Sequence, residues 1–151
     1  MRVRPLSATA LLAVLLLAVG AGIVSAAAPV QTFVVQLTGD SGGDADGKGV
    51  AVIRLDMRTG LVCYTINVRR IGVPTEPGAG LGAAHIHDDA TGGIFVDLDT
   101  DWVGRKHSFT TRGCVDATTA QLTALATAPE LYYVNIHTSA FPGGAVRGEI
   151  G

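Results

Sequence analysis

Two short stretches decide how this chain folds, Ala84-His85-Ile86-His87-Asp88 and Tyr133-Val134-Asn135-Ile136-His137-Thr138. Side chains alternate between two faces along a β-strand, so His85 and His87 point the same way and Ile86 points to the opposite face. His137 stands in the same alternation of apolar and polar residues. Three of the four histidines in the chain lie in these two stretches. We therefore ask whether the fold brings the three imidazoles together.

The sequence around these stretches predicts further short strands separated by turns rich in glycine and proline. A helix is predicted over about 118–127, because Thr118 and Gln121 fit a capping box and Pro129 would end it. Phe141-Pro142-Gly143-Gly144 is interpreted as the last turn. This pattern is typical of an all-β protein, an antiparallel Greek-key β-sandwich of about eight strands with one short helix. The expected strands are 32–37, 50–56, 61–68, 83–88, 94–98, 108–115, 131–138 and 145–150.

Residues 1–28 have the features of a secretory signal peptide. Arg2 and Arg4 precede an apolar run over 11–19, and small residues follow it. This run is shorter than the ~20 apolar residues that span a bilayer. We expect cleavage at about 26–28, one β-sandwich domain over 30–151, and a secreted or extracytoplasmic protein without a membrane span in its mature chain.

The charge of the chain argues against nucleic acid as a partner. The formal net charge is −2 at pH 7. Loss of the two arginines in the leader would leave a mature chain at about −4, with no basic surplus and no long basic run.

Cys63 and Cys114 are the only cysteines, and both lie in the part of the chain that is expected to be exported. Two cysteines in an oxidising compartment most simply form one disulfide. The alternative is a pair of free thiols, one of them a metal ligand or nucleophile.

The three histidines are candidate metal ligands. Imidazole suits copper, zinc, iron and nickel, and two histidines two positions apart on a strand start about 6.5–7 Å apart. His137 from an adjacent strand could complete a site, with Asp88 and Asn135 as candidates to orient the rings. The alternative is structural: the imidazoles would hydrogen-bond to Asn135, Thr138 and nearby backbone and lock the rim of the sandwich.

Other kinds of site are excluded by their spacing. Asp44 and Asp46 do not fit a calcium loop, since the first ligand position falls on Gly42 and the last on Ile53. No catalytic triad can be assembled, and no glycine-rich loop with phosphate-binding spacing precedes a helix.

Three motifs in this order resemble the chordin-type (CHRD) domain family. They are Ala84-His85-Ile86-His87, then Tyr133-Val134-Asn135-Ile136-His137-Thr138, and finally Phe141-Pro142-Gly143-Gly144-Ala145-Val146-Arg147-Gly148-Glu149-Ile150. The resemblance covers about 32–150. It implies an exported β-sandwich module with no generally assigned catalytic activity.

A more distant likeness is to copper-zinc superoxide dismutases, which are similar sandwiches with an H-x-H strand and a later histidine strand. The likeness implies that His85, His87 and His137 are copper ligands and that Arg147 guides an anion. The chain lacks the histidine- and aspartate-bearing loop that holds zinc in those enzymes, and it also lacks their fourth copper histidine.

The function expected from the sequence is therefore a binding or interaction module without assigned catalysis. Its partner would be an unknown extracellular protein or a cell-envelope ligand. The alternative is a copper-binding redox protein with a three-histidine site. No cofactor is established by the sequence, and copper is the candidate.

Overall fold

The computed structural model describes residues 30–151 except Ser41, Ala79 and Asp99. The predicted signal peptide, 1–28, lies outside the described residues. The elements in chain order are β1 (Val30–Thr38), β2 (Lys48–Asp56), β3 (Leu61–Arg69), β4 (Ala84–Asp88), β5 (Ile94–Asp97), β6 (Val103–Arg105), β7 (Ser108–Asp116), α1 (Thr119–Thr127), a 3-10 turn (Pro129–Leu131), β8 (Tyr132–Thr138) and β9 (Phe141–Glu149).

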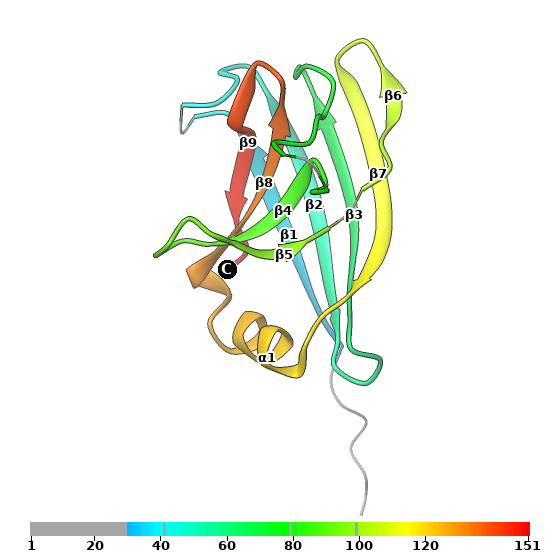
Figure 1. The fold of residues 1–151 in the computed structure, drawn as a ribbon, viewed down its shortest axis with the longest axis vertical. Helices are drawn as coiled ribbons and strands as arrows, with labels where there is room; N and C mark the ends of the chain where they lie inside the picture. Colours follow the sequence, from blue (N-terminus) through cyan, green and yellow to red (C-terminus); the bar gives the residue numbers. More distant parts are fainter. Residues whose placement is uncertain (1–29, 41, 79, 99) are drawn as a thin grey trace, which may run out of the picture.

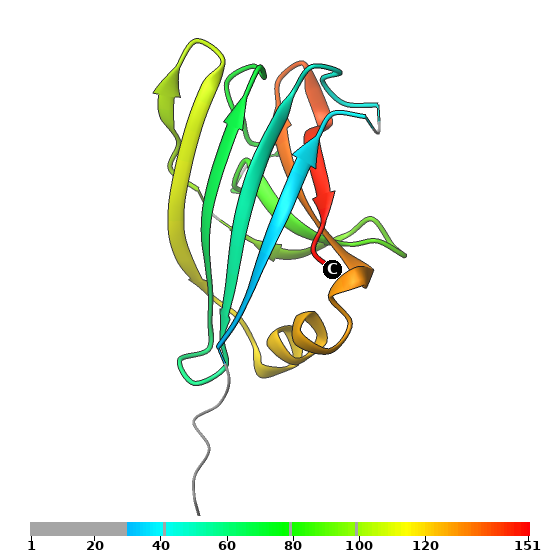
Figure 2. The same cartoon turned by 180° about the vertical axis from the view of Figure 1, so that it is seen from behind.

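All pairings between these strands are antiparallel, in the order β5-β4-β8-β9-β1-β2-β3-β7-β6. The sheet curls so that the half formed by β5, β4, β8 and β9 packs across the half formed by β1, β2, β3, β7 and β6 (Figures 1 and 2). The two halves join at β1 and β9 through a single residue pair, Thr38 with Arg147. The chain crosses between the halves after β3, after β5 and after β7.

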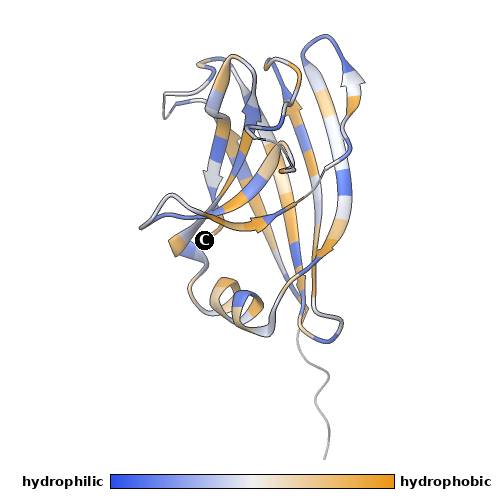
Figure 3. Cartoon of the chain, in the orientation of Figure 1, coloured by the Kyte–Doolittle hydropathy of each residue, from blue (hydrophilic) through white to orange (hydrophobic). Residues whose placement is uncertain are grey.

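The core fills the space between the two halves. Along the long strands β1, β2 and β3, hydrophobic residues that point inward alternate with more polar ones, and Figure 3 shows the mixture of both kinds by colour. Ile53 and Ile66 from one half meet Ile86 and Ile136 from the other, all at 0% exposure. Helix α1 closes one end with Leu122 and Leu125 (Figure 1). Its N-terminus carries the predicted capping box between Thr118 and Gln121, a feature that typically contributes about 1 kcal/mol.

The predicted disulfide is confirmed. Cys63 and Cys114 lie directly opposite each other on β3 and β7 and form an S–S bond. No free cysteine remains in the described chain.

The all-β antiparallel architecture and the single short helix are confirmed. Two details of the prediction are wrong. A ninth strand, β6, was missed because its three residues are all exposed and show no alternation. The last turn lies at 139–140 and not at 141–144, because Thr138 already pairs with Phe141, and β9 begins there.

Candidate metal centre

Strands β4 and β8 are direct neighbours, and their register places the histidines. His85 lies opposite Asn135, and His87 lies opposite Tyr133. These residues share one face of the sheet, while Ile86, Val134 and Ile136 point into the core between the halves. The histidines therefore lie on the outer face of their half of the sheet.

The three imidazoles converge on one point. The ring centroids lie 5.4 Å apart for His85 and His87, 4.9 Å for His85 and His137, and 5.8 Å for His87 and His137. One nitrogen from each ring lies within 4.8 Å of the other two. Within the described residues, no other group of three histidine, cysteine or carboxylate side chains is brought together in this way.

Although they lie on an outer face, the histidines are buried. Their exposed fractions are 0% for His85, 7% for His87 and 4% for His137. Part of the β3–β4 connection runs beside them and pairs with the end of β8: Thr75 N donates to His137 O, and His137 N donates to Ala83 O. Pro74 forms a bridge with Thr138 on the same strand.

Backbone carbonyls fix the orientation of two rings. His87 Nδ1 lies 3.0 Å from Gly92 O, and His137 Nδ1 lies 2.8 Å from Pro142 O. A carbonyl only accepts hydrogen bonds, so each neutral ring must carry its proton on Nδ1. Nε2 of each ring is then left with a free lone pair, and both Nε2 atoms are buried without a hydrogen-bond partner.

Neither ring nitrogen of His85 makes a hydrogen bond of good geometry, although the backbone of Gly82 lies close enough to raise its pKa. Its Nε2 lies 3.6 Å from Asp97 Oδ1, just beyond hydrogen-bonding distance. Asp97 faces His85 across the β4–β5 pairing, and it accepts hydrogen bonds from Gly82 N at 3.1 and 3.3 Å. The sequence analysis missed Asp97 as a partner of the site, because its pairing with His85 depends on the register of a hairpin.

The surroundings of His85 and His137 favour the neutral form that a metal requires. The pKa of His85 is lowered to about 4, mainly by burial and also by the neighbouring His137 and His87, against the raising effects of Asp97 and of a backbone hydrogen bond with Gly82. Burial also lowers the pKa of His137, against the raising effect of its hydrogen bond to Pro142.

The three other predicted residues lie around the site without joining the histidines. Asp88 caps the turn after β4, where its carboxylate accepts from Thr91 N at 2.9 Å and Thr91 Oγ1 at 3.0 Å. Asn135 lies between His85 and Arg147 in the register and donates from Nδ2 to Gly143 O at 3.0 Å. The Arg147 guanidinium carbon lies 5.1 Å from the centroid of the Tyr133 ring, which stacks on His87.

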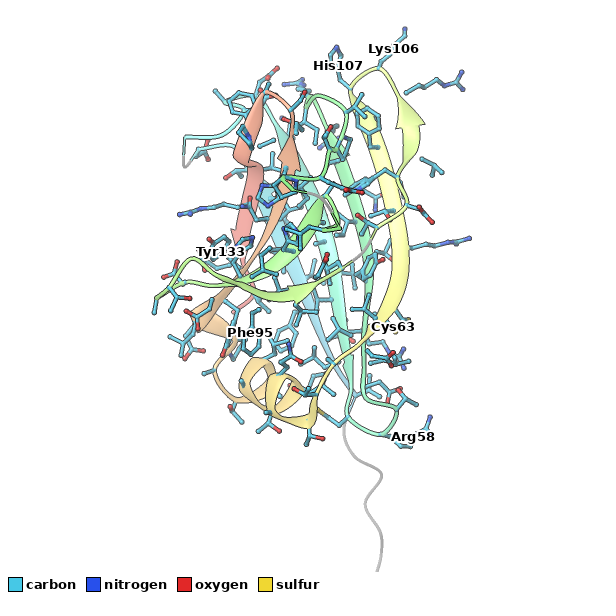
Figure 4. All side chains as sticks on the ribbon, viewed as in Figure 1. Arg58, Cys63, Phe95, Lys106, His107 and Tyr133 are labelled. Atoms are coloured by element: carbon cyan, nitrogen blue, oxygen red, sulfur yellow. A yellow bond between two sulfur atoms is a disulfide. The ribbon has the colours of Figure 1, made fainter. Side chains whose placement is uncertain are left out.

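The fourth histidine stands apart from the site. His107 is exposed, beside Lys106 at the tip of the β6–β7 turn, while Tyr133 lies on the other half of the sheet (Figure 4). Its Nδ1 lies 3.2 Å from Ile71 O.

The comparisons with known proteins identify a family and no individual relative. A family model described as the CHRD domain matches residues 33–150. No curated protein and no solved structure matches the chain significantly. In the part of the chain that the structure describes, no helix is long and apolar enough to cross a membrane.

Proposed function

We propose that this chain, which belongs to the CHRD domain family, is an exported copper-binding protein whose ligands are His85, His87 and His137. One observation carries the proposal: three buried imidazoles present nitrogens without hydrogen-bond partners to a common point. The sequence alone favoured an interaction module over a metal site. The geometry of the histidines supports the metal site.

The donor set fits copper better than the other metals that imidazole binds. Nitrogen sites bind Cu²⁺ more tightly than Zn²⁺, Ni²⁺ or Fe²⁺, and three protein ligands do not make the closed four-ligand set of a structural zinc site. Among the described residues, no thiolate or carboxylate joins the three rings as a fourth ligand. Bound copper would supply one-electron redox chemistry. The protein's own contribution is to hold the rings, with Gly92 and Pro142 fixing the proton on Nδ1 of His87 and His137.

A purely structural role explains less of what is observed. The hydrogen bonds to Gly92 and Pro142 are of the kind that a structural rim predicts. However, four ring nitrogens at the site remain buried and unpaired, both of His85 and one each of His87 and His137. A buried polar group without a partner typically destabilises the folded state by about 1–3 kcal/mol. A cluster of three histidines that served rigidity alone would therefore lower the stability of the fold.

The redox alternative from the sequence gives Arg147 the role of attracting an anionic substrate. Arg147 lies in the same register row as His85, two strands away, and its charge rests on the Tyr133 ring. A cation at this position raises the local concentration of anions near the histidines. We assign no reaction to the site, and the role of Arg147 stays a prediction.

Two features support export. The leader-like residues 1–28 precede the domain, and the Cys63–Cys114 disulfide is typical of an oxidising compartment. The matched family is consistent with an extracellular location.

We also propose the second function expected from the sequence, an interaction module for a cell-envelope ligand or another extracellular protein. It is favoured by a row of cations without an ion-pair partner among the described residues, which runs along the outer face of the sheet from β9 to β6 and is described in the next subsection.

Titration of the purified mature protein with Cu(II), followed by absorption and electron paramagnetic resonance, tests the metal proposal. We expect one equivalent to bind with nitrogen hyperfine structure, and His85→Ala and His137→Ala to lose that signal. His107→Ala is the matched control, because it removes an exposed imidazole away from the site. An unchanged spectrum in both site variants would contradict the proposal.

A further inference from the structure

A single register row crosses the sheet from β9 to β6 and carries four cations. Arg147 pairs with Thr38, Thr38 with Lys48, Lys48 with Arg69, Arg69 with Ser108, and Ser108 with Arg105. Adjacent partners in a sheet point to the same face, so these six side chains share the outer face. The row contains four cations, two hydroxyls and no carboxylate.

The exposure of the residues confirms that the side chains of this row point outward. Thr38, Arg69, Ser108 and Arg105 are exposed, whereas the next row along the strands, Leu37, Gly49, Val68 and Phe109, carries buried apolar side chains on β1, β3 and β7. Neighbouring strands are about 4.8 Å apart, so the five steps of the row extend over roughly 24 Å.

Lys48 and Arg69 are directly opposite each other, an arrangement that destabilises a sheet. Neither residue forms an ion pair with a described carboxylate, and the same holds for Arg105 and Arg147. Within the described residues, the only arginine in a salt bridge is Arg54, with Asp56 at 3.2 Å. An unrelieved like-charge pair on an exposed face suggests that an anion from outside the chain offsets the repulsion.

A groove of about 450 Å³ lies over this part of the sheet, across β1, β2, β3 and β7. Its polar lining comes from Lys48 and Arg69, together with hydroxyl and amide side chains in the same and the next outward row. Thr110 Oγ1 donates to Asn67 Oδ1 at 2.7 Å, which leaves the Asn67 amide NH₂ as a donor toward a ligand. No acidic side chain lines the groove.

These features select one class of ligand. The cations are spread along a row and do not converge on one point, which fits an extended polyanion better than a single small anion. Hydroxyl and amide groups suit a ligand rich in hydroxyls. The one aromatic residue of the lining, Phe109, is only 7% exposed, so no platform is available for the base stacking by which proteins hold single-stranded nucleic acid.

We propose that this groove binds an acidic polysaccharide chain, with Lys48 and Arg69 contacting its carboxylate or sulfate groups and Arg105 and Arg147 extending the contact on either side. The proposal rests on the second function above, the interaction module, and it does not depend on the metal centre.

Binding of fluorescein-labelled polyuronate oligomers to the full mature chain, measured by anisotropy at low and moderate salt, tests the proposal. We expect Arg69→Glu and Lys48→Glu each to weaken binding about tenfold or more, since each puts a carboxylate against the ligand. Arg58→Glu is the matched control. It makes the same change in net charge in the β2–β3 turn, at the opposite end of the molecule from Lys106 (Figure 4), and it should change the affinity less than twofold.

Three results would overturn the proposal: equal losses in Arg69→Glu and Arg58→Glu, tight binding of neutral dextran, or equally tight binding of single-stranded DNA. The same titration is repeated with His85→Ala, whose affinity for polyuronate should be unchanged. If the polyuronate fails to bind but the protein still binds an envelope fraction from its own cells, the ligand class is wrong and the interaction function stands. If neither binds, both are wrong.

Discussion

The ring of Tyr133 lies flat against the ring of His87, with centroids 5.1 Å apart and only 10° between the two planes. Tyr133 is 8% exposed, and Arg147 covers it from β9. His87 is therefore held by a hydrogen bond in its own plane, to Gly92 O, and by a stacked ring against its face. This double restraint fixes the direction in which His87 Nε2 points.

Replacing Tyr133 should loosen the copper site without removing a ligand. Stacked aromatic pairs contribute about 0.5–1.5 kcal/mol, so Tyr133→Leu should weaken copper binding by about threefold to tenfold and broaden the paramagnetic spectrum. Tyr133→Phe keeps the ring and serves as the control. Equal affinities of the Leu and Phe variants in a competition titration would show that the stack does not position His87.

His85 should stabilise the protein only when metal is bound. In the metal-free protein its two buried nitrogens have no hydrogen-bond partner. His85→Leu, which keeps a similar volume, should therefore raise the free energy of unfolding of the metal-free protein by about 1 kcal/mol or more, as judged by urea denaturation in a chelator. His107→Leu, at an exposed position, is the comparison. A loss of stability in His85→Leu would indicate that this histidine has a structural role.

Gly144 and Gly143 form a natural matched pair beside the site. Gly144 has a φ of +128°, and a Cβ there would lie 2.2 Å from Asn135 Oδ1. Gly144→Ala should therefore displace Asn135 and lower the free energy of unfolding by about 2 kcal/mol or more. Gly143→Ala meets nothing within 4 Å and should change the same free energy by less than about 0.5 kcal/mol. Similar thermal midpoints for the two variants would contradict this account.

The disulfide should contribute stability and leave the metal centre unaffected. It joins residues 51 apart in sequence, on strands of the half that does not carry the histidines. The double variant Cys63→Ser with Cys114→Ser should lose roughly 2–4 kcal/mol of unfolding free energy and keep its copper affinity. Reduction of the unmodified protein should reproduce the loss. A copper spectrum of the double variant that differs from that of the unmodified protein would contradict the separation of the two features.

Acid should destabilise the protein partly through Asp56. Hydrogen bonds from the backbone of Thr59 and Arg58, both at 3.1 Å, hold the pKa of Asp56 below its usual value. A depressed pKa in the folded state adds stability above the ordinary pKa near 4, and that stability is lost as the pH falls through the lower folded value. Asp56→Asn should therefore lose less stability than the unmodified protein between about pH 4 and pH 2. Urea denaturation over this range measures the effect, and exposed Asp116→Asn is the control. Parallel curves for Asp56→Asn and the unmodified protein would contradict it.

The sequence predicted much of this arrangement because strand periodicity is local information. The H-x-H pattern places His85 and His87 on one face without knowledge of any other element, and the family motifs add the strand of His137. The turn at 139–140 was misplaced because glycine and proline in Phe141-Pro142-Gly143-Gly144 signal a turn. In the structure these residues begin β9. The glycine at 144 is there for its positive φ beside Asn135, and not for a turn.

Contacts that depend on register between distant strands could not be predicted in this way. Asp97 meets His85 only because of the pairing of β4 with β5, and Arg147 reaches Tyr133 only through that of β8 with β9. The cationic row has the same origin. Lys48, Arg69 and Arg105 are far apart in a chain with a negative net charge, and the pairing of β2, β3, β7 and β6 brings them into line.

The burial of the histidines affects the rate at which a bound metal would exchange as well as its affinity. Backbone hydrogen bonds at Thr75 and Ala83 tie the β3–β4 connection to β8 beside the site, and the turn that carries Gly92 and the start of β9 at Pro142 hold two of the rings. A copper ion held there could leave only when these segments open, so its rate of exchange would follow local unfolding and not the strength of three bonds to nitrogen. The metal present when the chain folds would then be the metal that the protein keeps.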